Sequence, residues 1–370
     1  MQKSLILALT SMMLVASLGT AAQNSSGKVR FAIVGLEHDH VWGILKDLAE
    51  VPQAQLVAIA DPHPELIQKA KGRVPAGVKF YSNYITMLDQ VKPQAVITTT
   101  ATNLHLPVAR ACARRHIDVE MEKPMATTAA DAREMERLAK AGHIKLMVNY
   151  FDNWLPSYQQ LYSEVKDGRI GPIQQLISQN GHQGPREIGA SKWANAWLYD
   201  PVKNGGGALM DFACYGAALS VWLKGRPTKV FARSLTLKTS QHNKVEDDAV
   251  VVLEYPDGTA IIEPSWDWPF SMERIQVFGP GGSLLALPNA LLYRAANTRA
   301  STEEGDGQSV LLSMPVPAEA NPIAYFIDCI QHDKAVEGML SARLNVEVDE
   351  ILDAAKESIR TGRAVDMPAE

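Results

Sequence analysis

The fold is decided by the stretch Val29-Arg30-Phe31-Ala32-Ile33-Val34-Gly35, an apolar, strand-like run that ends in a glycine. Further strand-like runs follow at residues 56–60, 95–99, 119–121 and 146–148, with helical patterns at residues 106–115 and 129–141. Such alternation predicts a parallel sheet whose strands are joined by right-handed helical crossovers. Residues 28–148 are therefore expected to form a Rossmann-like α/β domain that binds a nucleotide.

The pattern changes beyond Asn149. Strand-like stretches separated by turn sequences occur at residues 173–179, 228–237, 249–255, 259–264 and 273–278. They predict a second, α+β domain over residues 149–368 with a largely antiparallel open sheet. We expect this domain to bind the substrate and to form a homo-oligomer through its sheet. Helices around residues 323–332 and 346–361 are expected to pack back at the domain junction.

The composition favours a small-molecule ligand. The 370 residues are 46% hydrophobic, which is enough to bury two cores. The net charge is −5, and the isoelectric point is near 6.0. Because the chain also contains no block of Lys and Arg, a nucleic-acid partner is not expected.

The first 22 residues have the pattern of a secretory signal peptide. Lys3 precedes an apolar run over residues 5–18, and small residues at 20–22 predict cleavage before Gln23. The run is shorter than the roughly 20 residues that span a bilayer, so no membrane attachment is expected after cleavage. The segment contains no Arg-Arg pair, which favours the general secretion route and a periplasmic location.

Two motifs supply the groups for proton chemistry. The Glu-Lys-Pro motif at residues 122–124 places Lys123 just after a predicted strand. Glycines 205–207 precede a run in which Asp211 and Tyr215 lie four residues apart and, on a helix, share one face. An amine, a carboxylate and a phenol brought together can move protons on a carbinol.

Together these motifs resemble the family of glucose-fructose oxidoreductase, inositol dehydrogenase and the rhizopine-catabolism protein MocA, and the likeness runs from Val29 to Pro368. In that family the lysine touches cofactor and substrate, and the glycine-rich segment opens a helix bearing an aspartate and then a histidine or tyrosine. The tyrosine form is most similar to the glucose-fructose oxidoreductase and dihydrodiol dehydrogenase branch. The resemblance implies that Lys123, Tyr215 and Asp211 are catalytic and also contact the substrate.

The first strand-to-helix turn departs from the dinucleotide fingerprint Gly-x-Gly-x-x-Gly. The segment reads Gly35-Leu36-Glu37-His38-Asp39-His40, so Glu37 replaces the glycine that leaves room for phosphate, and Asp39 adds like charge. Asp61, at the end of the second strand, stands where a ribose hydroxyl is held and favours NAD over NADP. The residues expected to bind NAD are Gly35, Glu37, His38, Asp61, Asn103, His105, Glu122 and Lys123.

The histidines allow an alternative cofactor, a divalent transition metal. His38 and His40, with Glu122 and His182, supply imidazole and carboxylate ligands of the kind that Zn, Mn or Fe accept. His40, however, can simply pack at a helix N-terminus, where the helix dipole disfavours a cation. His105 stands where the family commonly has a histidine without metal. The leading interpretation therefore has no metal site.

Residues of the second domain have two interpretations each. His182 follows the first strand of that domain, where the family's substrate contacts often enter, or it is an ordinary exposed hairpin histidine. The tryptophans can stack on sugar faces but are more often core residues; they are Trp193, Trp197, Trp266 and Trp268. The acidic run at residues 246–248 is interpreted as a solvated strand edge.

Three functions follow. The first is an exported oxidoreductase that acts on a sugar, polyol or glycoside by NAD-linked hydride transfer. The second is a redox-neutral, metal-assisted lyase or hydrolase that acts on a sugar or keto-sugar in the same crevice. The third is a catalytically silent sugar-binding protein, which is placed last because all three proton-transfer groups are present.

Overall fold

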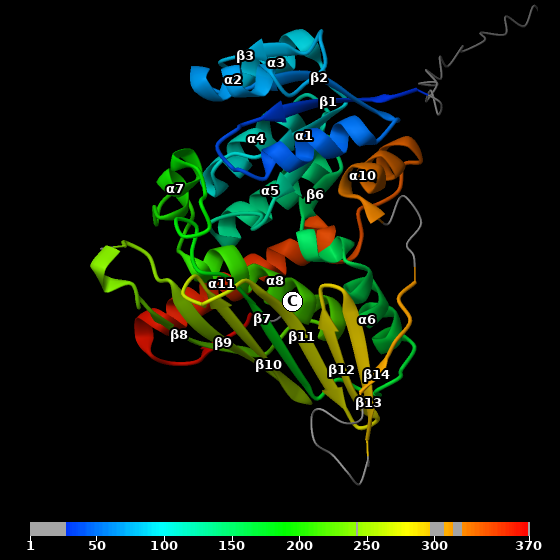
Figure 1. Cartoon of the computed structure of the whole chain (residues 1–370), viewed down its shortest axis with the longest axis vertical. Helices are drawn as coiled ribbons and strands as arrows, with labels where there is room; N and C mark the ends of the chain where they lie inside the picture. Colours follow the sequence, from blue (N-terminus) through cyan, green and yellow to red (C-terminus); the bar gives the residue numbers. More distant parts are fainter. Residues whose placement is uncertain (1–26, 242, 297–306, 314–319, 369–370) are drawn as a thin grey trace, which may run out of the picture.

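The computed structural model describes residues 27–241, 243–296, 307–313 and 320–368 (Figure 1). The signal peptide predicted at residues 1–22 lies outside the described residues. The described residues form two sheets, one of six strands and one of nine. The predicted fold class, a Rossmann-like parallel sheet followed by an α+β domain with a mostly antiparallel sheet, is confirmed.

The first sheet has the strand order β3-β2-β1-β4-β5-β6, and all of its strand pairs are parallel. Its strands are β1 Val29–Val34, β2 Ala54–Ala60, β3 Lys79–Tyr81, β4 Ala95–Thr98, β5 Asp118–Glu122 and β6 Leu146–Asn149. Its helices are α1 Val41–Glu50, α2 Pro64–Lys71, α3 Tyr84–Val91, α4 His105–Ala113 and α5 Ala129–Gly142. Strands β1 to β3 are added toward one edge of the sheet, and strands β4 to β6 are added toward the other edge. The order of the strands therefore reverses between β1 and β4, and ligands are expected beyond the carboxyl ends of these two strands.

Both faces of the first sheet are buried. On β1, Phe31 and Ile33 pack in the core that contains residues of α1, whereas Ala32 and Val34 pack in the core on the other face. This explains why the strands read as continuous apolar runs in the sequence. Helix α10, Pro322–Gln331, contributes Phe326 to the core beneath Phe31.

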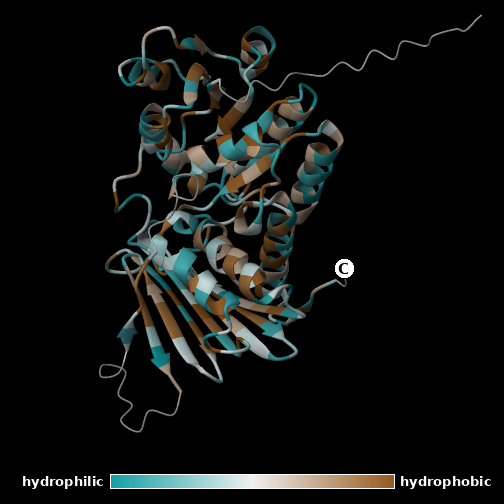
Figure 2. Cartoon of the chain, turned by 90° about the vertical axis from the view of Figure 1, so that its right-hand side faces the viewer, coloured by the Kyte–Doolittle hydropathy of each residue, from teal (hydrophilic) through white to brown (hydrophobic). Residues whose placement is uncertain are grey.

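The second sheet has the order β14-β13-β12-β11-β7-β10-β9-β8-β15, and among its described pairs only β7 and β10 run parallel. Its strands are β7 Gln175–Gly181, β8 Lys229–Leu235, β9 Asp248–Tyr255, β10 Gly258–Ser265, β11 Met272–Gly279, β12 Gly282–Leu287, β13 Ala290–Ala295, β14 Gln308–Ser309 and β15 Val365–Asp366. The accompanying helices are α6 Pro156–Lys166, α7 Lys192–Leu198, α8 Ala208–Lys224 and α11 Ala342–Thr361. Figure 2 shows hydrophobic and hydrophilic residues alternating along these strands, as expected for a sheet covered on one face.

Helix α8 lies between the second sheet and the first domain (Figure 1). Gly216 permits its close approach to the sheet, because a Cβ there would lie 2.5 Å from Cγ2 of Ile262 and 2.9 Å from Oγ of Ser178. Helix α11 contacts α8 and strand β8 of the second domain and α5 of the first. These contacts hold α8 beneath the carboxyl ends of the parallel strands. None of the described helices is both long and apolar enough to cross a membrane.

Candidate active site

Lys123 and Asp211 meet at the junction of the two domains. Lys123 follows β5, and Asp211 lies in the first turn of α8. The ammonium Nζ of Lys123 donates to Oδ1 of Asp211 and, over 2.9 Å, to the carbonyl oxygen of the same residue. Because the Lys123 side chain is only 4% exposed, the pair is shielded from water. The structure therefore brings the two sequence motifs together.

Tyr215 lies one helical turn beyond Asp211. The Lys123 Nζ is 5.1 Å from the centroid of the Tyr215 ring and 5.5 Å from that of Phe212. Tyr150 packs its ring edge against Tyr215, with the centroids 5.4 Å apart. The amine, the carboxylate and the phenol thus form one cluster, in which the ammonium lies over the faces of two aromatic rings.

The cluster favours particular protonation states. Burial is the largest single influence and opposes the charge of both Lys123 and Asp211. Their mutual attraction and hydrogen bond, together with neighbouring groups, outweigh burial, so the Lys123 pKa is raised and the Asp211 pKa is lowered. Burial, followed by the negative charge of Asp152, raises the Tyr215 pKa well above its usual range. At neutral pH the site therefore contains an ammonium, a carboxylate and a neutral phenol.

Trp266 fixes the Asp211 carboxylate and was not identified as a site residue from the sequence. Its indole Nε1 donates to Oδ2 of Asp211 over 2.9 Å. Since Trp266 is fully buried, it cannot serve as a sugar-stacking platform. No local motif marks this contact, because strand β10 and helix α8 are far apart in the sequence.

The start of α8 is anchored by Glu246. Its Oε1 accepts hydrogen bonds from the amides of Gly207, over 2.7 Å, and Leu209, over 3.0 Å. A carboxylate at this end satisfies free amides and complements the helix dipole. Asp247 is buried and accepts from the Leu237 and Lys238 amides over 2.6 and 2.9 Å. The interpretation of residues 246–248 as a solvated edge is therefore wrong, because the first two side chains cap backbone amides.

His182 lies on the Asp211 side of the cluster. Its Nδ1 accepts from the Gly184 amide over 2.9 Å, and its ring meets the Phe212 ring edge-on at 5.0 Å. Burial lowers the His182 pKa, although the Asp211 carboxylate opposes this change. The structure therefore places a neutral, half-buried imidazole beside the Asp211 carboxylate.

Asp152 is a second residue that the sequence did not reveal. It is buried, and its Oδ2 accepts from Nδ2 of Asn180 over 2.9 Å. Burial and then the Glu273 carboxylate raise its pKa to about 7. Asp152 is also the strongest charge acting on Tyr215, so it helps to keep the phenol protonated.

The first turn retains part of the dinucleotide-binding geometry. Gly35 has φ +88°, and a Cβ there would lie 2.6 Å from Cγ2 of Thr100, so the turn needs glycine both for its conformation and for its packing. Asp61 lies at the end of β2. Its carboxylate accepts from the amides of Leu36, over 2.6 Å, and His63, over 2.7 Å.

The two acidic residues of the turn are engaged by other protein groups. Glu37 lies 3.7 Å from Nε2 of His63. Oδ2 of Asp39 accepts from the Ser191 amide over 2.6 Å. These contacts explain how the turn accommodates both carboxylates, although it has lost two of the three fingerprint glycines.

Two buried polar atoms lie beyond the end of β4. Oδ1 of Asn103 and Nε2 of His105 are buried and have no hydrogen-bond partner within the described part of the chain. Nδ1 of His105 is occupied by the Met125 carbonyl, 3.1 Å away. Buried polar atoms of this kind are usually satisfied, so both fit a bound group that has hydrogen-bonding atoms of its own.

His38, His40 and Glu122 form a further cluster. Nδ1 of His40 lies 3.2 Å from Oε2 of Glu122, and the His38 and His40 ring centroids are 4.1 Å apart. Burial is the largest single influence and opposes the Glu122 charge, but His40, His38 and Lys123 together outweigh it and lower the Glu122 pKa to about 2. Burial lowers the His38 pKa well below its usual range. His182 interacts instead with Asp211 and does not belong to this cluster.

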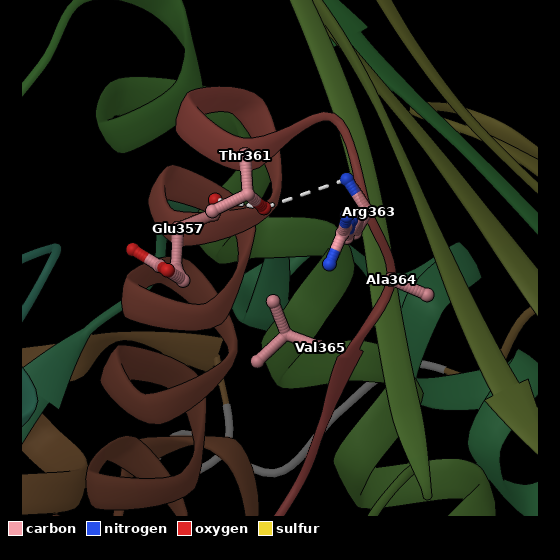
Figure 3. A pocket seen from close by; sticks show the side chains of 5 residues that line it. All are labelled: Glu357, Thr361, Arg363, Ala364 and Val365. Carbon is pink, nitrogen blue, oxygen red and sulfur yellow. Dashed lines mark hydrogen bonds between the residues drawn. The ribbon is translucent and has the colours of Figure 1, made fainter.

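A surface hollow lies away from this cluster. It has a volume of about 500 Å³ and lies at the end of α11, where it is lined by Glu357, Thr361, Arg363, Ala364 and Val365 (Figure 3). It shares no residue with the Lys123 cluster. The side chains of the Lys123 cluster therefore identify the candidate active site better than surface hollows do, because Lys123 and Tyr215 are nearly closed off from solvent.

Comparison with known families agrees with this geometry. Residues 29–150 match the oxidoreductase family with an NAD-binding Rossmann fold, and residues 158–285 match the GFO/IDH/MocA C-terminal domain. The fold and the site define an NAD(P)-dependent oxidoreductase. The chain belongs to the Gfo/Idh/MocA family, as the two motifs predicted.

Individual relatives are distant. The rhizopine catabolism protein MocA of Rhizobium meliloti is 26% identical over 215 residues, which are 57% of this chain and 63% of that protein. The myo-inositol 2-dehydrogenase of Thermotoga maritima is 25% identical over 65% of this chain and 70% of its own length. The D-apiose dehydrogenase of Paraburkholderia graminis is 23% identical over 89% of this chain and 86% of its own length.

Solved structures share the fold over nearly the whole chain. The aldose-aldose oxidoreductase of Caulobacter crescentus, complexed with glycerol, has a TM-score of 0.77 at 24% identity, covering 92% of this chain and 99% of its own. A levoglucosan dehydrogenase in complex with NADH and levoglucosan has a TM-score of 0.78 at 19% identity, covering 92% of this chain and all of its own.

Proposed function

We propose that this chain is an exported, NAD-linked oxidoreductase that acts on a sugar, polyol or glycoside. The observation that carries the proposal is the buried Lys123–Asp211 pair, which lies against the ring of Tyr215. The relatives named for inositol, apiose and levoglucosan support a polyhydroxylated substrate.

Tyr215 is the proton-transferring group in this account. Because its pKa is raised, the phenol is neutral in the resting enzyme, and the first proton movement open to it is donation to a carbonyl oxygen. Lys123 stabilises negative charge that develops on that oxygen, and Asp211 holds the lysine in place. The nicotinamide, when bound, supplies the hydride for reduction or accepts it for oxidation. His182, on the Asp211 side, contacts a neighbouring hydroxyl.

The dinucleotide would be held by groups that the structure places at the ends of three parallel strands. They are the turn at Gly35, Asp61 beyond β2, and Asn103 and His105 beyond β4. The acidic Asp61 supports NAD over NADP, because a carboxylate at this strand end repels a 2′-phosphate.

Export and self-association complete the proposal. The predicted signal sequence at residues 1–22 supports secretion to the periplasm.

A homo-oligomer is supported by the outer face of the second sheet, where β7, β10 and β11 carry half-buried side chains. Ile177, Gln179, Ile261, Glu263, Arg274 and Gln276 line a shallow hollow there. Replacing Ile261 by Glu should shift the mass measured by sedimentation toward that of a monomer; an unchanged mass would exclude this face.

The experiment that tests the catalytic assignment is turnover with NAD across a panel of sugars and polyols, for wild type and for Lys123→Met. We expect the substitution to lower kcat by at least a hundredfold, because the developing charge on the substrate oxygen loses its partner. Asp211→Asn, which keeps the side-chain shape, should lower kcat less. Wild-type turnover in a folded Lys123→Met protein would refute the assignment.

A further inference from the structure

Three side chains of the metal-ligating type converge at the carboxyl ends of β1 and β5. They are His38 and His40, in the turn after β1, and Glu122, the last residue of β5. Each offers one ligand atom, and these atoms lie within 4.8 Å of one another. In the part of the chain that the structure describes, no other three histidine, cysteine or acidic residues converge in this way.

The protein holds two of these side chains and leaves the third free to adjust. His38 and Glu122 are buried, with Trp197 packed against the His38 ring at 5.3 Å. The His40 side chain is 50% exposed. A small rotation of the His40 side chain can therefore bring its ring nitrogen into the same coordination sphere as the ligand atoms of His38 and Glu122, without disturbing the core.

The hydrogen bonding of His38 leaves a suitable lone pair. Its Nδ1 accepts from the His40 amide over 3.2 Å, so this nitrogen carries no proton. At 3.2 Å, that bond is at the long end of the usual range for an N–H donor. Nδ1 of His38 can therefore exchange the amide for a metal, leaving Nε2–H as the outward donor that metal-bound histidines commonly keep.

The surrounding charges permit a cation. The nearest ammonium, Lys123, is neutralised by Asp211. The first amides of α1 are also occupied, because Val41 donates to the His38 carbonyl over 3.1 Å and Trp42 to the Asp39 carbonyl over 3.2 Å. The partial positive charge at the N-terminus of α1 is thus partly compensated by carbonyl groups of the preceding turn. The Glu122 carboxylate supplies the negative charge that two imidazoles alone would lack.

We propose that His38, His40 and Glu122 bind a divalent transition metal, with an open coordination position on the solvent side of His40. Two imidazoles and one carboxylate form a donor set suited to Fe, Mn or Zn. Three protein ligands with an open position are typical of catalytic rather than structural metal sites. The open position would take an oxygen ligand, either water or a hydroxyl or carbonyl of the sugar beside Lys123. This inference goes beyond the proposed oxidoreductase function and does not depend on dinucleotide binding.

The test uses the full secreted chain, stripped with a chelator and then titrated with Co²⁺ in the absence of dinucleotide and sugar. Wild type should bind one equivalent and develop the visible absorption of a cobalt ion with nitrogen and oxygen ligands. His40→Ala should weaken binding at least tenfold and alter the spectrum; its exposed position favours normal folding, which thermal unfolding would verify. His332→Ala is the matched control, because His332 forms a similar pair with Asp328 on the surface, at 2.9 Å.

The outcomes separate the metal site from the oxidoreductase function. Binding that is lost in His40→Ala and retained in His332→Ala supports the site, whatever the NAD titration shows. Absence of stoichiometric binding by wild type overturns it, as does equal binding by wild type and His40→Ala. NAD binding measured separately on the chelator-treated protein tests the oxidoreductase function alone.

Discussion

The indole Nε1 of Trp266 donates to Oδ2 of Asp211 over 2.9 Å, while Oδ1 of the same carboxylate holds the ammonium of Lys123. One carboxylate of helix α8 therefore joins the residue that follows strand β10 to the residue that follows strand β5. Because each of its oxygens has a fixed donor, the lysine is positioned before any substrate arrives. Preorganised charge of this kind is a large contributor to enzymatic rate enhancement.

Replacing Trp266 by Phe should lower kcat/KM by about ten- to a hundredfold, because a hydrogen bond to a charged acceptor contributes about 1.5–3 kcal/mol. Trp268→Phe is the matched control, since Trp268 is a nearby, half-buried tryptophan. Steady-state kinetics on both variants, with circular dichroism to verify folding, make the comparison. Equal kinetics for the two variants would show that the indole does not position Asp211.

Tyr215→Phe should lower kcat by about a hundred- to ten-thousandfold, the usual contribution of a general acid or base. Since the pKa of Tyr215 is raised well above 10, the phenol stays protonated as the pH rises through the neutral and mildly alkaline range. The kcat for carbonyl reduction should therefore show no alkaline decrease between pH 7 and about pH 9 that depends on this tyrosine. A decrease near pH 8 that disappears in the variant would contradict this protonation state.

Gly35→Ala should destabilise the protein by about 3 kcal/mol, from positive-φ strain and the clash with Thr100. Gly43→Ala is the matched control within helix α1, because a Cβ there meets no heavy atom within 4 Å. It should stabilise the protein by about 0.5–1 kcal/mol, the helix preference of alanine over glycine. Urea unfolding of the two variants would show opposite shifts; a stable Gly35→Ala protein would mean that the turn tolerates a side chain.

Glu120 should make stability depend on pH. Its carboxylate is fully buried on β5, has no hydrogen-bond partner among the described residues, and has its pKa raised by burial to about 8. With a folded pKa above the unfolded value, its stability contribution is complete at low pH and is lost as the pH rises toward 8. At neutral pH the penalty is on the order of 3 kcal/mol, since each pKa unit corresponds to about 1.4 kcal/mol.

Glu120→Gln removes that titration while keeping the shape of the side chain. The variant should be similar to wild type near pH 4.5 and increasingly more stable than wild type up to about pH 8. Thermal unfolding of both proteins across this range is the measurement. A stability difference that stays constant with pH would show that Glu120 does not titrate as its burial implies.

Much of the first domain was predictable because its strands are buried on both faces and read as apolar runs. Strand β3 was missed, since Lys79, Phe80 and Tyr81 are exposed or half-buried and form no such run. The two motifs identified Lys123, Asp211 and Tyr215, because short spacing on a strand end and a helix face is visible in the sequence. The residues were brought together only by the packing of α8 across the domain junction.

The supporting residues were not predictable in the same way. Trp266 and Glu246 contact α8 from distant strands and loops, and neither lies in a local pattern that differs from an ordinary core tryptophan or a surface acid. Asp152 likewise depends on the long-range contact with Asn180. Contacts of this kind arise from tertiary packing, so a single sequence shows the candidate catalytic groups better than the groups that hold them.

We expect NAD to bind beside Lys123, at the carboxyl ends of the parallel strands, for hydride transfer. The most direct measurement is nucleotide content, by absorbance and mass spectrometry, of the undialysed protein from its native compartment, followed by calorimetric titration of NAD into the emptied protein. We expect stoichiometric NAD or NADH and a change in nicotinamide absorbance when the sugar substrate is added. Protein that contains no nucleotide, fails to bind added NAD and still transforms a sugar would contradict it.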